Sequence, residues 1–210
     1  MLGHRAVVRH LLAVAASISL ASCAVKDPTQ YYTLGQGVAG RAESGASTST
    51  PASSAARGAT IGVGPVIMPS YLDRVQIVTR TGADLVDLSQ YHRWAEPLED
   101  GVARILAEEL GARVPTERIV IFPWRGVVAR AMTYQVVVTV LRFDGSPGGN
   151  VTLDTRWRIL AREGDELVFR RSTVTEPTAG PGYQPVVAAM TRALATLGQE
   201  IAAEIRARPR

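Results

Sequence analysis

Apolar and polar residues alternate through much of the second half of the chain, with the period of two that is typical of half-buried β-strands. The alternation is clearest over residues 150–162, where Val151 and Trp157 fall on one face and Arg156 and Arg158 on the other. Further runs that alternate or are rich in β-forming residues lie at 31–34, 60–66, 75–80, 84–88, 118–122, 132–143 and 166–175. This pattern predicts a mostly antiparallel sheet with one buried and one solvated face.

Two further segments carry apolar residues at helical spacing. The first helix is predicted over 97–110, where Pro97 suits the first helical position and Gly111 would end the helix. The second is predicted over 185–206. The apolar positions are Leu98, Val102, Ile105, Leu106 and Leu110 in the first, and Val187, Met190, Leu194, Leu197, Ile201 and Ile205 in the second. The predicted fold class is therefore α+β, a two-layer domain with two helices packed on one face of the sheet.

The N-terminal residues have the features of a bacterial lipoprotein signal peptide. Two arginines and no acid precede an apolar run at 11–21, which is about half the length of a membrane-spanning helix. The run ends in Leu20-Ala21-Ser22-Cys23, a lipobox, in which the cysteine thiol receives diacylglycerol and the chain is cut before the cysteine. We predict a signal peptide over 1–22 and lipidation at Cys23. The alternative is an ordinary signal peptide whose product keeps a free thiol.

The residues after the lipobox predict how the mature chain is held. Ala24 stands where an inner-membrane retention signal has aspartate, which favours an outer-membrane anchor with the domain facing the periplasm. Residues 23–30 would be the lipidated tether and 31–210 a single domain. The stretch at about 35–59 consists almost entirely of Gly, Ala, Ser, Thr and Pro, so it is predicted to be a disordered insertion. The alternative is that this stretch is itself the main tether.

Composition excludes several classes of function. Without its signal peptide the chain keeps 21 basic and 19 acidic residues, and Lys26 is its one lysine. No cluster of basic and aromatic residues marks a nucleic-acid site. Cys23 is the one cysteine, so intrachain disulfides, zinc ribbons and thiol catalysis are excluded.

A catalytic or metal site finds little support in the residue types present. His92 is the one histidine after the signal peptide, so pairs of histidine ligands cannot form. A Ser–His–Asp triad would need His92, yet no G-x-S-x-G motif accompanies it. We predict no enzymatic activity, no cofactor and no metal, with a periplasmic hydrolase using His92 as the rival.

Two short stretches combine aromatic, aliphatic and charged side chains as protein interfaces do. The predicted partner or self-assembly contacts are Tyr71, Leu72, Asp73 and Arg74, together with Arg93 and Trp94. The alternative is structural: Tyr71 and Leu72 would plug the end of the sheet, and Trp94 would be a core residue that docks the first helix.

Several motifs in a fixed order resemble the signature of one family. They are Ile61-Gly62-Val63-Gly64-Pro65-Val66, Pro69-x-Tyr71-Leu72-Asp73-Arg74-x-Gln76-Ile77-Val78, Arg93-Trp94-Ala95-Glu96-Pro97-Leu98, Val140-Leu141-Arg142-Phe143-Asp144-Gly145 and Leu153-Asp154-x-Arg156-Trp157. With the lipobox, they are similar to the ABC-type transport auxiliary lipoproteins, the proteins that resemble paraquat-inducible protein C. The resemblance covers essentially the whole mature chain.

The resemblance implies a non-enzymatic subunit of a system that moves lipids or organic compounds between two membranes. The implied partners are a mammalian-cell-entry domain protein and inner-membrane permease components, with a homo-oligomer as a further expectation. A structural lipoprotein of the envelope, without a transport role, is the alternative.

Overall fold

The structure is a computed structural model that describes residues 27–35 and 59–208. The predicted signal peptide, Cys23 and nearly all of the predicted insertion lie outside the described residues. The strands are β1 (Gln30–Tyr32), β2 (Ala59–Ile67), β3 (Gln76–Arg80), β4 (Val86–Trp94), β5 (Thr116–Ile121), β6 (Tyr134–Gly145), β7 (Asn150–Ala161) and β8 (Glu166–Pro177). The helices are α2 (Leu98–Arg113), α3 (Val127–Ala131) and α4 (Tyr183–Arg206).

The sheet is organised around β6. On one side, β7 runs antiparallel to β6 and β8 antiparallel to β7. On the other side, β6 pairs in parallel with β2 along its first half and with β3 at Gly145. β5 pairs in parallel with β2, whereas β4 is antiparallel to β3 and β1 parallel to β4. The described residues thus form one open, mixed, mostly antiparallel sheet, which confirms the α+β class.

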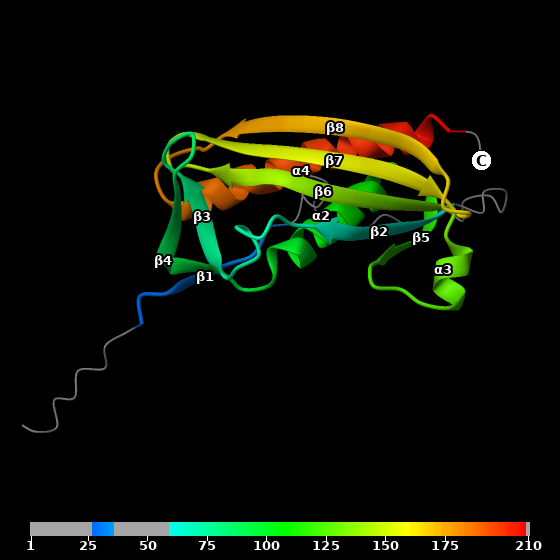
Figure 1. Cartoon of the computed structure of the whole chain (residues 1–210), viewed down its shortest axis with the longest axis horizontal. Coiled ribbons are helices and arrows are strands. Elements are labelled where there is room, and N and C mark those ends of the chain that lie inside the picture. Colours follow the sequence, from blue (N-terminus) through cyan, green and yellow to red (C-terminus); the bar gives the residue numbers. More distant parts are fainter. Residues whose placement is uncertain (1–26, 36–58, 209–210) are drawn as a thin grey trace, which may run out of the picture.

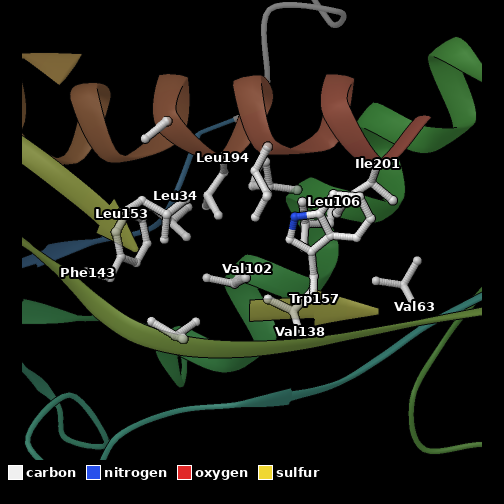
Figure 2. Close-up of a cluster of buried hydrophobic side chains, with 14 of the residues drawn as sticks. Leu34, Val63, Val102, Leu106, Val138, Phe143, Leu153, Trp157, Leu194 and Ile201 are labelled. Atoms are coloured by element: carbon white, nitrogen blue, oxygen red, sulfur yellow. The ribbon is translucent and has the colours of Figure 1, made fainter. Parts of the chain in front are cut away.

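The two long helices cover one face of this sheet (Figure 1). α4 packs on β7 and β8, α2 packs on β2 and β5, and the helices contact each other. Figure 2 shows Leu106 of α2 and Ile201 of α4 lying over Trp157 of β7 in this core. Arg156 and Arg158 point to the opposite, solvated face and are exposed, as the alternation predicts.

The prediction that Gly111 ends the first helix is wrong. α2 continues to Arg113, and the N–H of Val114 still donates to the carbonyl of Leu110 at 2.8 Å. A different glycine has a strict role, because a Cβ atom on Gly198 of α4 would lie 2.6 Å from the Cβ atom of Glu109 on α2. The close approach of the two helices therefore depends on the missing side chain.

Three elements differ from the predicted ones. β4 extends to Trp94 rather than ending at residue 88, because β1 and β3 pair with its second half. The short helix α3 was not expected from the sequence. β6 continues through Asp144 to Gly145, beyond the predicted end of this strand at residue 143.

Candidate functional site

A fully buried carboxylate, Asp144, lies at the end of β6. Arg80 of β3 donates to it twice, from Nε to Oδ1 and from Nη2 to Oδ2, at 2.9 Å each. Arg142 donates from Nε to Oδ1 at 2.8 Å, and the Tyr71 hydroxyl donates to Oδ2 at 3.0 Å. The Asp144 network, as we call these four residues, fastens the segment before β3 to the centre of the sheet.

The electrostatics of the Asp144 network favour the charged carboxylate. Burial by itself would raise the pKa of Asp144, but hydrogen bonds from Arg80, Arg142 and Tyr71 outweigh burial and hold the pKa below its ordinary value. Burial, followed by the neighbouring negative charge of Asp144, raises the pKa of Tyr71. The tyrosine thus stays a neutral hydrogen-bond donor and the aspartate stays an anion.

The predicted contact residues Tyr71 and Leu72 lie inward. Leu72 is 2% exposed and belongs to the core, while Tyr71 is half-buried through its bond to Asp144. A tight turn places them there, in which the Leu72 N–H donates to the Pro69 carbonyl at 2.9 Å. Their placement matches the structural alternative, in which they plug the end of the sheet.

Asp73, Arg74 and Arg93 remain at the surface. The N–H of Trp94 donates to the carbonyl of Val75 at 2.7 Å, which brings Arg74 and Arg93 to one junction of β3 and β4. Asp73 is exposed, and Trp94 is 5% exposed and lies in the core. The structure therefore brings the two predicted stretches together but turns their apolar members inward.

The two arginines of this junction differ from the other arginines near them. The Nε atoms of Arg74 and Arg93 are buried and have no hydrogen-bond partner within residues 27–35 and 59–208. By contrast, Arg80 and Arg142 share Asp144, and Arg104 pairs with Glu96 at 2.6 Å. Two guanidinium groups with unsatisfied Nε donors, one of which also interacts electrostatically with Asp27, thus lie beside the exposed Asp73. Such a polar patch is suited to acidic groups of a partner.

Sequence reasoning missed an aromatic hollow beside β1. The rings of His92 and Tyr183 are stacked at 3.9 Å, and the Tyr32 hydroxyl lies 2.8 Å from Nδ1 of His92. These side chains, with Tyr31 and the start of α4, line a hollow of about 750 Å³. The residues come from three distant parts of the chain, so no local motif could have revealed them.

In this hollow His92 is surrounded by aromatic side chains. Its ring contacts are with two tyrosines rather than with a carboxylate and a nucleophile. Across the part of the chain that the structure describes, no cluster of three His, Cys, Asp or Glu side chains could hold a metal ion. Nor is any helix there long and apolar enough to cross a membrane.

Known structures share this architecture. An uncharacterized protein superposes with a TM-score of 0.65 at 21% identity, over 84% of this chain and 98% of the other. A protein from Xanthomonas campestris gives a TM-score of 0.63 at 16% identity, over 84% of this chain and 94% of the other. At these identities the similarity establishes a shared fold.

The sequence itself identifies the family. Residues 42–202 match the family described as the ABC-type transport auxiliary lipoprotein component. The chain belongs to this family, whose role is auxiliary to transport and which is not a family of known enzymes. Comparison with curated proteins gives no match.

Proposed function

We propose that this protein is the lipid-anchored periplasmic subunit of a transport system that moves lipids or organic compounds between the two membranes. The family match over residues 42–202 is the observation that carries the proposal. In this role, the acylated Cys23 holds the domain at the outer membrane, and the domain binds a mammalian-cell-entry domain protein that works with an inner-membrane permease. Self-association of the domain is part of the same proposal.

Lipidation is tested by replacing Cys23 with Ser. Cells fed an alkyne analogue of palmitate should label the wild-type chain and leave Cys23→Ser unlabelled, because only the thiol accepts diacylglycerol. Labelled wild-type protein should sediment with outer-membrane vesicles in a density gradient. Label on Cys23→Ser, or none on the wild type, would remove the anchor from the proposal, and sedimentation with the inner membrane would overturn its location.

The partner surface proposed here is the junction patch of Asp73, Arg74 and Arg93. The Nε donors of Arg74 and Arg93 have no hydrogen-bond partner among the described residues, whereas many other arginines are paired with carboxylates. A partner carboxylate would satisfy donors that are already half withdrawn from water, which is the setting in which interface arginines contribute most. The patch also adjoins β1, since Tyr31 is paired with Arg93.

Arg74→Gln combined with Arg93→Gln tests this surface. We expect capture of the mammalian-cell-entry protein from solubilised membranes, identified by mass, to fall more than about tenfold. The melting temperature should change by only a few degrees, because glutamine keeps much of the packing of the side-chain stem. Arg156→Gln with Arg158→Gln, on the exposed face of β7, is the matched control and should keep full capture. Undiminished capture by the first variant would place the contact elsewhere.

A further inference from the structure

Exposed apolar side chains are concentrated between β5 and β6. Ile121, Phe122 and Val127 are 42%, 48% and 80% exposed, and Trp124 between them is partly exposed. Single exposed apolar residues are ordinary on protein surfaces, but four within seven positions form a patch that calls for a partner. We name residues 121–130 the apolar loop.

The glycines of β2 hold the apolar loop in place. The N–H of Phe122 donates to the carbonyl of Val63 at 2.9 Å. A Cβ atom on Gly62 would lie 3.0 Å from the Trp124 ring, and one on Gly64 would lie 2.7 Å from the Cβ atom of Phe122. The bare backbone of β2 thus allows the loop to lie against the strand. The loop therefore packs against β2 while its apolar side chains remain exposed.

The apolar loop is also cationic. Residues 121–130 contain Arg125 and Arg130 and no acidic residue, and Arg118 lies on the adjoining strand β5. Arg118, Arg125 and Arg130 are exposed, and none of them has an ion-pair partner among the described residues. The turn between β7 and β8 contains acidic residues as well as Arg162, so it adds no excess of positive charge. The excess therefore comes from the arginines of the apolar loop and of β5 beside it.

Figure 1 shows where the apolar loop lies relative to β1, the first strand of the described chain. The N-terminal end of β1 and the α3 region both lie along the lower edge of the fold in this view, and β8 lies along the upper edge. One plane below the domain can therefore approach both the residue where the tether enters the fold and the apolar loop.

We propose that the apolar loop docks on the anionic lipid surface of the bilayer that holds the protein, as a second contact beside the acyl anchor. The proposal rests on the anchor assigned above. Tryptophan and phenylalanine favour the boundary between headgroups and acyl chains, and exposed arginines attract anionic headgroups. Such a contact would turn a domain on a flexible tether into one with a fixed orientation toward its partner.

The three tryptophans of the chain make a direct test possible. Trp94 and Trp157 are 5% and 2% exposed, so a quencher in the membrane should reach Trp124 alone. The lipidated full chain is reconstituted into vesicles of phosphatidylethanolamine and phosphatidylglycerol, with or without bromine on the acyl chains. We expect bromine to quench part of the tryptophan emission, and Trp124→Phe to abolish that quenching while leaving the emission of the other two tryptophans.

Matched variants separate docking from anchoring. Val127→Asp should reduce the quenching of Trp124 severalfold at an unchanged melting temperature, because it places a charge on the most exposed apolar position. Leu85→Asp, at an apolar residue that is 65% exposed on a different loop, should leave the quenching unchanged. Vesicles of zwitterionic lipid alone should give weaker quenching than anionic ones.

Failure of membrane docking and failure of the proposed lipid anchor give different results. A chain that carries the acyl label but shows no quenching by brominated lipid would overturn docking and leave the proposed function standing. If Trp124 is instead shielded from aqueous acrylamide without being quenched by bromine, the loop binds protein and the lipid proposal is wrong. Absence of the acyl label would contradict the proposed anchor rather than the apolar loop.

Discussion

Replacing Trp157 with Ala is expected to lower the free energy of unfolding by about 4 kcal/mol. Trp157 is 2% exposed and lies between the sheet and both long helices, as Figure 2 shows. Its indole N–H donates to the Ser172 hydroxyl at 2.9 Å, so the substitution removes a hydrogen bond as well as packing. Chemical denaturation at equilibrium measures the loss.

Trp157→Phe and Arg158→Ala calibrate this measurement. Phenylalanine keeps most of the buried volume but leaves Ser172 without the indole donor, so we expect a loss of roughly 1–2 kcal/mol. Arg158 is the exposed neighbour on the opposite face of β7, where a substitution should change stability by less than about 0.5 kcal/mol. If Trp157→Ala cost no more than Arg158→Ala, the face of the sheet that packs on the helices would be assigned incorrectly.

The sequence predicted which faces of β7 and α4 are buried, because hydrophobic periodicity is a local signal. In β7 buried positions alternate with more exposed ones from Val151 to Ile159, with Thr155 as the one polar residue on the buried face, and in α4 the apolar stripe runs through the whole helix. Both elements were located to within about two residues. Periodicity of this kind reports directly which face is buried, because side chains in strands repeat every two residues and in helices every 3.6.

Parallel pairing was not visible in the sequence. β2 lies between β5 and β6 although it contains Gly62, Gly64 and Pro65, residue types that are uncommon in the interior of a central strand. A register shift between Val63 and Val66 lets β2 pass the proline and pair again with β6. The apolar loop packs against Gly62 and Gly64. This contact joins segments about sixty residues apart in the sequence, so periodicity cannot predict it.

The candidate site was predicted in part. The segment Tyr71–Arg74 and the pair Arg93 and Trp94 were selected by residue type, and the structure brings the two stretches together at one junction. The inward placement of Tyr71 depends on Asp144, whose Asp-Gly context resembles a turn. Tyr71 and Arg80, from distant positions, and the nearby Arg142 donate to that aspartate within a strand, so its role becomes visible only in three dimensions.

Replacing Asp144 with Ala should cost about 3 kcal/mol, because it deprives Arg80, Arg142 and Tyr71 of their shared buried acceptor at once. The loss falls at the low end for a buried ion pair, since the Arg142 side chain is 40% exposed and can reach water. Asp154→Ala is the control. It removes the partner of Arg171, whose side chain is 59% exposed, and should cost less than about 1 kcal/mol.

Acid titration of stability gives an independent check on Asp144. Its pKa in the folded protein lies below the ordinary value of 3.8, so the unfolded chain takes up the proton first as the pH falls. The stabilisation from the Asp144 network is therefore fully present above about pH 5 and is lost as the pH falls through the folded-state pKa. Asp144→Ala should consequently lose less stability than the wild type between pH 5 and pH 2. Parallel curves for the two proteins would show that Asp144 is not held as a stabilised anion, and the junction patch would then lack the support that positions it.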